Sequence, residues 1–101
     1  NVYSVEVENA IATYPGVAQV AVIGVPSAQW GEAVHAIVVP QEGATLTEDE
    51  IIEHAKSRIA GFKVPKTVEL RAGPLPLSGA MKILKRDLRA PYWEGQDRSV
   101  G

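Results

Sequence analysis

The segment Val17-Ala-Gln-Val-Ala-Val-Ile-Gly-Val25 is followed seven residues later by a second apolar segment, Ala33-Val-His-Ala-Ile-Val-Val39. Both segments are short and rich in β-branched residues, which is typical of largely buried strands rather than helices. The connection over residues 26–32 begins with Pro26 and predicts a loop. We therefore expect the two segments to pair as antiparallel strands.

A short helix is predicted before the first of these strands. Polar residues over 6–9 favour helix, and the helix should end near Thr13 because Pro15-Gly16 follows. Ser4 is the expected N-cap residue, since a serine hydroxyl can accept a hydrogen bond from the unpaired N–H groups of the first turn. The strand pair is thus expected to follow a helix directly.

A second helix is predicted after the strand pair. Thr47 and Glu50 have the spacing of a capping box, in which each side chain accepts from the backbone N–H of the other residue. Apolar residues recur at helical spacing as far as Ile59, so the helix is expected to continue that far. Gly61 is expected to stop it, because glycine is preferred just past the C-terminus of a helix.

A third strand and a third helix complete the predicted elements. The strand is expected over Lys66–Arg71, and a loop stiffened by two prolines follows over residues 73–79. The last helix is expected over Met81–Leu88, with basic residues away from its apolar side. The resulting order, α-β-β-α-β-α, predicts an α+β fold with a small three-stranded, mostly antiparallel sheet packed with helices.

Length and composition limit the classes of protein that remain. The chain has 101 residues and a mass of 10.8 kDa, which fits one domain over residues 1–101. It has no cysteine and two histidines, so we expect neither a disulfide scaffold nor a metal site. No apolar run approaches the roughly 20 residues of a membrane span, so no transmembrane segment is predicted. The lack of cysteine fits a cytoplasmic protein.

The net charge of −2 conceals an asymmetry between the two parts of the chain. Residues 1–60 carry two basic and eight acidic residues, whereas residues 61–101 carry eight basic and four acidic ones. An anionic ligand is therefore favoured by the second part. The excess is too small for nucleic-acid binding, which needs a broad basic face.

The motifs of several enzyme classes are missing. There is no phosphate-binding P-loop, no dinucleotide-binding glycine pattern and no nucleophile elbow, so the chain does not complete a catalytic site unaided. A proline-containing loop leads to Lys82, whose flexible point charge could neutralise a phosphate or a developing negative charge. The residues alone favour a simpler interpretation, in which Lys82 belongs to a solvated basic face.

Five segments then occur in a fixed order along nearly the whole chain: Asn1-Val-Tyr-Ser-Val-Glu-Val-Glu-Asn9, Tyr14 to Pro26, Trp30-Gly-Glu32 with Ala36-Ile-Val-Val39, Ala60-Gly-Phe-Lys-Val-Pro-Lys66, and Leu75 to Arg89. Together they resemble the C-terminal small domain of the adenylate-forming superfamily, the AMP-binding enzyme C-terminal domain. This superfamily includes acyl- and aryl-CoA synthetases, peptide-synthetase adenylation domains and luciferases. The sequence is most like a fatty-acyl-CoA synthetase.

The resemblance implies a catalytic role for Lys82. In the family, this lysine contacts the acyl carboxylate and the α-phosphate of ATP while the acyl-adenylate forms, with Mg²⁺ assisting. Met81 stands where the family usually has glycine, and its bulk would restrict the approach of the loop. The family binds ATP, Mg²⁺ and the acid mainly in a large N-terminal adenylation domain. That domain is expected to be missing here, so the isolated chain is expected to be inactive.

The resemblance also implies a binding site for coenzyme A. Trp30 and Phe62 would line the pantetheine channel, and Lys63 and Lys66 would face the phosphates. Some relatives have arginine at the position of Val64. From the residues alone, Trp30 could equally cover the loop between the strands, and Phe62, the only phenylalanine, could belong to the core.

The resemblance therefore predicts the C-terminal domain of an ATP-dependent acyl-CoA (fatty acid–CoA) ligase. Its partners would be the N-terminal adenylation domain, the acyl substrate and coenzyme A. Two alternatives remain open: a free-standing, non-catalytic α+β binding module, and the corresponding subdomain of a luciferase-like or peptide-synthetase enzyme. The family alternates between two orientations of the small domain, one presenting the lysine and the other the coenzyme A face.

Overall fold

The computed structural model describes residues 2–29, 31–77, 79–80 and 82–94. The elements in chain order are α1 (Val2–Ala12), β1 (Val17–Ser27), β2 (Gly31–Pro40), α2 (Glu48–Lys56), the 3₁₀ turn η1 (Gly61–Lys63), β3 (Thr67–Leu70) and α3 (Lys85–Trp93). This order confirms the predicted α-β-β-α-β-α arrangement and the α+β class.

The sheet has the order β1-β2-β3, with β1 and β2 antiparallel and β2 and β3 parallel. The pairing of β1 with β2 continues to Ser27 and Gly31, so the predicted loop over 26–32 is too long at both ends. Pro26 is accommodated because β1 is an edge strand of the described sheet, where a missing N–H is tolerated. Gly31, at φ +79°, adopts a backbone conformation that other residues rarely take.

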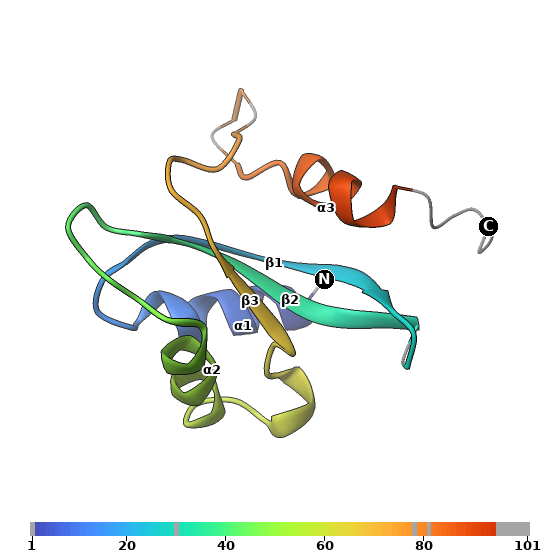
Figure 1. Cartoon of the computed structure of the whole chain (residues 1–101), viewed down its shortest axis with the longest axis horizontal. Helices are drawn as coiled ribbons and strands as arrows, with labels where there is room; N and C mark the ends of the chain where they lie inside the picture. Colours follow the sequence, from blue (N-terminus) through green and yellow to red (C-terminus); the bar gives the residue numbers. More distant parts are fainter. Residues whose placement is uncertain (1, 30, 78, 81, 95–101) are drawn as a thin grey trace.

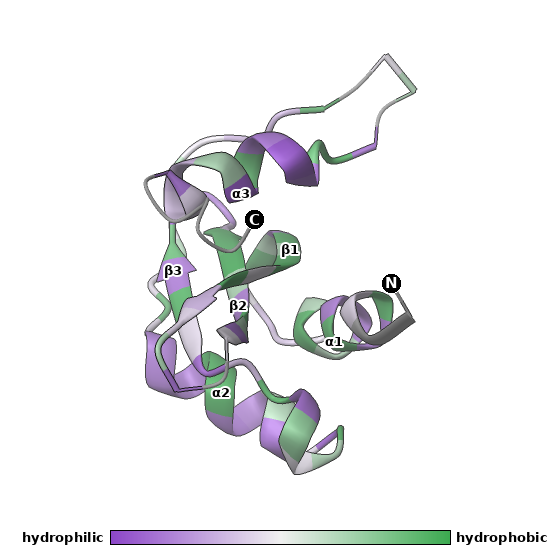
Figure 2. Ribbon diagram, turned by 90° about the vertical axis from the view of Figure 1, so that its right-hand side faces the viewer, coloured by the Kyte–Doolittle hydropathy of each residue, from purple (hydrophilic) through white to green (hydrophobic). Residues whose placement is uncertain are grey.

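Helices cover both faces of the sheet. In Figure 1, α1 and α2 lie below the strands and α3 lies above them, and Figure 2 shows the same layers from the side. One core fills the face toward α1 and α2, and a second fills the face toward α3. Alternate residues of β2 divide between them: Ala36 and Val38 enter the first core, whereas Ile37 and Val39 enter the second. The antiparallel pair β1 and β2 is therefore apolar on both faces of the sheet.

The start of α2 was predicted correctly and its end was not. Thr47 and Glu50 form both hydrogen bonds of the capping box. The helix ends at Lys56 rather than near Ile59, and Ser57 is its C-cap residue, whose hydroxyl donates to the carbonyl oxygen of His54 at 2.6 Å. Gly61 therefore does not stop α2; it opens η1.

The last helix begins later than predicted. It starts at Lys85 rather than Met81, because Ile83 pairs with Leu77 in an antiparallel bridge and the N–H of Leu84 donates to the carbonyl oxygen of Pro76 at 2.9 Å. These pairings hold residues 82–84 outside the helix. A contact between separate parts of the loop thus overrides the local helical pattern.

A polar network fastens α3 to the sheet. The side chain of His35 is buried, with Nδ1 2.6 Å from the Thr67 hydroxyl and Nε2 3.1 Å from the Tyr92 hydroxyl. Tyr92 donates to Glu69, which also accepts two hydrogen bonds from Arg71. The Tyr92 oxygen is then left to accept from Nε2–H of His35, and in the neutral imidazole Nδ1 accepts from the Thr67 hydroxyl.

The shifted pKa values of this network agree with a neutral imidazole. Burial lowers the pKa of His35, and this effect outweighs the nearby Glu69 carboxylate. The hydrogen bonds from Arg71 lower the pKa of Glu69, which keeps that carboxylate charged. Burial, together with the hydrogen bond to Glu69, raises the pKa of Tyr92 to about 12. The phenol therefore remains a donor at neutral pH.

We predict that acid weakens this fold through His35. Below pH ~6.5 the unfolded chain takes up a proton on this imidazole that the folded chain resists, so the free energy of unfolding falls as the pH drops from 7 toward 5. One proton limits this slope to about 1.4 kcal/mol per pH unit. Urea unfolding at several pH values measures it. His35→Gln should be less stable at pH 7 but show a shallower slope, and an unchanged slope would contradict the assignment.

Candidate active-site loop and ligand groove

Lys82 lies on the loop between β3 and α3, which stands away from the sheet at the top of Figure 1. Its side chain is exposed. The bridge between Leu77 and Ile83 closes the loop, and the hydrogen bond from the Leu84 N–H to the Pro76 carbonyl fixes its base. The sequence placed Lys82 in the first turn of a helix over Met81–Leu88; in the structure it sits instead on a closed, hairpin-like loop before α3.

A separate groove contains two of the predicted coenzyme A residues. It is open to solvent, has a volume of about 620 Å³, and is lined by residues of α1, β1, β2, η1 and α3. Phe62 and Lys63 of η1 both contribute to the lining. The Phe62 side chain is 66% exposed, so the alternative that this residue belongs to the core is wrong. An exposed aromatic ring in a groove is available to stack on a ligand.

Ion pairs join three of the four basic residues that line the groove to carboxylates. They are Lys63 with Glu6 at 2.7 Å, Lys85 with Glu8 at 2.6 Å, and Arg89 with Glu32 at 3.8 Å. Each joins a cation from residues 61–101 to a carboxylate from residues 1–60. Lys63 also lies over the Phe62 ring, with Nζ 5.5 Å from its centroid. Most of the positive charge in the groove is therefore already balanced.

Lys85 has a structural role that the sequence did not indicate. Its Nζ donates to the Ser4 hydroxyl at 3.1 Å, and Ser4 lies inside α1 rather than at the predicted N-cap position. Glu8, its ion-pair partner, also accepts from the edge N–H of Val22 on β1 at 2.8 Å. Glu8 and Lys85 thus join α1, β1 and α3.

Sequence reasoning missed the basic residues that α3 contributes to the groove. Lys85, Arg86 and Arg89 all line it, and their spacing places them together once the helix begins at Lys85. The sequence placed these basic residues on the side of the helix away from its apolar face, but it did not show that this side borders a groove. The spacing of the three residues was the one available signal.

Among the described residues, neither Lys66 nor Val64 lines this groove. Lys66 is exposed and does not line it, while its backbone N–H donates to the Val34 carbonyl at 2.9 Å. Val64, where some relatives have arginine, is 6% exposed and belongs to the core toward α1 and α2. Trp30 and Met81 lie outside the described residues. The structure thus brings Phe62 and Lys63 together but joins neither Lys66 nor Lys82 to them.

The described part of the chain does not form a site suited to Mg²⁺. Mg²⁺ prefers carboxylate oxygen ligands, and within residues 2–29, 31–77, 79–80 and 82–94 no three acidic or histidine side chains gather where a metal could bind. The Mg²⁺ implied by the resemblance does not fit these residues. Over the same ranges, none of the helices has the length and apolar character needed to cross a bilayer.

Known proteins match this chain over most of its length. The family described as AMP-binding enzyme C-terminal domain matches residues 6–82. The feruloyl-CoA synthase of Amycolatopsis sp is 48% identical over 92 residues, covering 91% of this chain and 18% of that protein. The long-chain-fatty-acid–CoA ligase of Escherichia coli O6:H1 is 45% identical over 89 residues, covering 88% and 16%. The chain thus spans less than a fifth of the length of these relatives.

A solved structure shows the same fold. ATP-bound MatB from Rhodopseudomonas palustris superposes with a TM-score of 0.82 at 39% identity, covering 88% of this chain and 18% of that protein. Fold, ordered motifs and sequence identity all agree. The chain therefore belongs to the AMP-binding enzyme C-terminal domain family, the small C-terminal domain of adenylate-forming enzymes.

Proposed function

We propose that the chain is the C-terminal domain of an ATP-dependent fatty-acyl-CoA ligase. In this proposal, Lys82 acts in forming the acyl-adenylate and the groove beside Phe62 receives part of coenzyme A. The observation that carries the proposal is that Lys82 and the groove are separate: Lys82 does not line the groove that contains Phe62. Two surfaces on one small domain suit two half-reactions carried out in turn. The relatives are named as enzymes that form CoA products, which supports the thiol of coenzyme A as the acceptor of the acyl group in the second half-reaction.

Lys82 would serve the first half-reaction by its charge. A carboxylate oxygen attacks the α-phosphorus of ATP, the bond to pyrophosphate breaks, and negative charge crowds around the reacting atoms. An ammonium group on a flexible stem can be placed between the carboxylate and the phosphate. The closed base of the loop supports this role, because a lysine on an anchored loop loses less freedom when it reaches its target.

The groove would serve the second half-reaction. The exposed ring of Phe62 offers an apolar surface to the pantetheine arm, and Lys63 lies beside it to meet a phosphate. Lys66, exposed but outside the groove lining, stays a predicted phosphate contact. Trp30 stays a predicted channel residue.

In this proposal, the choice of acid would lie in a large N-terminal adenylation domain. One relative is named for feruloyl-CoA and another for long-chain fatty acids, although both match this small domain at similar identity. A domain shared by enzymes named for an aromatic and an aliphatic product does not itself select the acid. In this proposal, ATP and Mg²⁺ would bind mainly in the same large domain.

We predict that the 101-residue chain alone catalyses no ATP–pyrophosphate exchange with a fatty acid. The adenylate needs a pocket for ATP and acid, and this chain would supply only the lysine. Radiolabelled pyrophosphate exchange measures the activity directly. Exchange at the rate of a complete ligase would contradict the proposed division of labour.

In the full enzyme, Lys82→Ala should slow adenylate formation about 10²–10³-fold, or about 3–4 kcal/mol, because one preorganised charge is lost where negative charge develops. Transfer from a supplied acyl-adenylate to coenzyme A should be largely spared. Lys82→Arg should restore little, since a planar guanidinium cannot replace a point charge on a slim stem. Single-turnover measurements of the two half-reactions decide this.

The matched control is Lys56→Ala. Lys56 is an exposed lysine at the end of α2, on the opposite face of the sheet from α3, and it pairs with the neighbouring Glu53 at 3.2 Å. Its loss should leave both half-reactions near their original rates. An Ala variant of Lys56 as slow in adenylation as that of Lys82 would point to a general charge effect.

Phe62→Ala should show the opposite selectivity. We expect thioester formation to slow about tenfold, equal to about 1.4 kcal/mol, with adenylate formation nearly unchanged. The thermal midpoint should hardly move because the ring is 66% exposed. Val5→Ala, at another exposed apolar side chain of 53% exposure, is the control and should affect neither half-reaction. Equal losses in both half-reactions would exclude a role confined to coenzyme A.

A further inference from the structure

The base of the Lys82 loop is held by a residue distant in sequence. The stem that enters the loop contains Leu75, which is 2% exposed and packs in the core toward α3. Its backbone N–H donates to the side-chain oxygen Oε1 of Gln19 on β1 at 2.9 Å. This hydrogen bond links β1 directly to the stem of the loop that carries Lys82.

A bulge in β1 directs Gln19 toward this stem. Val17 pairs with Pro40 and Gln19 pairs with Val39, so two steps along β1 match one step along β2. Without the extra residue, Val17 and Gln19 would share one face of the sheet. With it, Val17 enters the core toward α1 and α2, whereas Gln19 aligns with Ala21 on the face toward α3.

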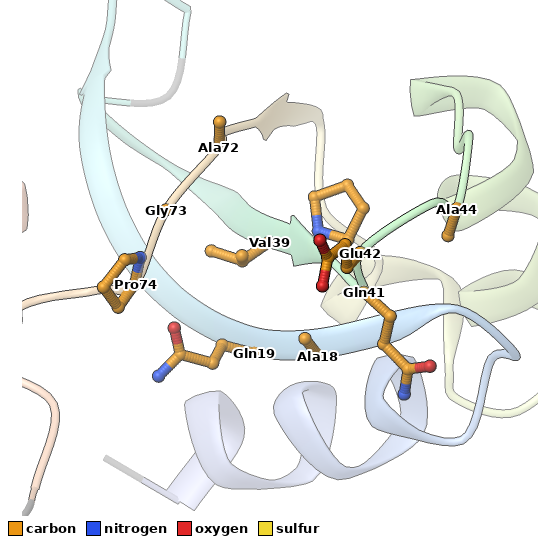
Figure 3. Close-up of a pocket in the computed structure, with 10 residues that line it drawn as sticks. Ala18, Gln19, Val39, Gln41, Glu42, Ala44, Ala72, Gly73 and Pro74 are labelled. Carbon is orange, nitrogen blue, oxygen red and sulfur yellow. The ribbon is translucent and has the colours of Figure 1, made fainter.

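The surroundings of Gln19 indicate that its hydrogen bond with Leu75 matters more for the position of the loop than for the stability of the fold. Its side chain borders an open hollow of about 580 Å³, shown in Figure 3 with Gln19 beside Pro74, the residue before Leu75. Water entering this hollow can replace a lost acceptor, so the Leu75 N–H need not remain unsatisfied. A water molecule cannot tie the stem to β1 as firmly as a side chain anchored in the sheet.

We propose that Gln19 is a positioning residue for Lys82: its amide oxygen, aimed by the β1 bulge, sets the place of the loop by accepting from the Leu75 N–H. This inference rests on the proposed function of Lys82. It adds a residue of the first strand to the machinery of adenylate formation, although Gln19 touches no reacting atom.

The test uses two substitutions at Gln19 in the full enzyme. Gln19→Met keeps the length of the side chain but removes the acceptor oxygen, and Gln19→Glu keeps an acceptor. Because a misplacement of about 1 Å can cost on the order of 10²-fold in rate, we expect the Met variant to slow adenylation by about 10-fold to 10²-fold. Thioester formation from a supplied adenylate should stay within about twofold. The Glu variant should recover most of the adenylation rate.

Gln41→Met is the matched control. Gln41 borders the same hollow, and Figure 3 shows its side chain at the far end from Pro74. It receives the same substitution without breaking the bond to Leu75, so both half-reactions should keep their rates. A Gln41 variant as slow as the Gln19 variant would overturn the inference.

Amide hydrogen exchange gives a readout that does not depend on catalysis. The Leu75 N–H should exchange faster in Gln19→Met than in the unsubstituted protein or in Gln19→Glu. Unchanged exchange, unchanged adenylation, or equal losses in both half-reactions would each overturn the positioning role. If Gln19→Met does not fold, Gln19→Asn carries the same expectation, since its amide is one methylene too short to reach Leu75.

The failure of this inference can be told from the failure of the proposed function. If Lys82→Ala leaves adenylation intact, the proposed role of the lysine is wrong, and the positioning role of Gln19 falls with it. If Lys82→Ala is severe and Gln19→Met has no selective effect, only the positioning role is wrong.

Discussion

The structure depends on the alternation of side chains along the antiparallel pair β1 and β2. Successive residues of these strands enter two different cores, so the pair is apolar on both sides and must be covered on both. A slip of one residue in the register would move every one of these side chains to the wrong face. The helices α1 and α2 on one side and α3 on the other are the consequence of this constraint (Figure 1).

The packing of α3 on its face of the sheet positions both candidate functional features, the Lys82 loop and the groove beside Phe62. Leu88 packs α3 into the core above the sheet, and Tyr92 ties the same helix to His35 and Glu69. The loop of Lys82 ends where α3 begins, and the first turns of α3 form part of the groove beside Phe62. One docked helix thus fixes both the end of the loop and a wall of the groove.

Local patterns in the sequence predicted the elements, and non-local contacts determined where several of them end. The capping box of Thr47 and Glu50 involves residues three apart, so its pattern is visible in the sequence. The start of α3 depends on a bridge across the loop, from Leu77 to Ile83, that no periodicity reveals. The hydrogen bond between Gln19 and Leu75 could not be predicted from the sequence either. It depends on a bulge in β1 and joins residues that lie 56 positions apart. Family motifs indicated Phe62 and Lys82, but not the α3 side chains that share the groove.

The charge asymmetry of the sequence takes on a different meaning in the folded chain. The excess of basic residues in the second part suggested an anionic ligand, yet Lys63 and Lys85 are held by Glu6 and Glu8 from the first part. Within the proposed function, an arriving phosphate would exchange with a carboxylate rather than meet an unbalanced cation. Such an exchange yields less free energy than binding to a bare cation, because the internal ion pair must first be broken. If the groove receives coenzyme A as proposed, weak binding of this kind would favour its release after each turnover.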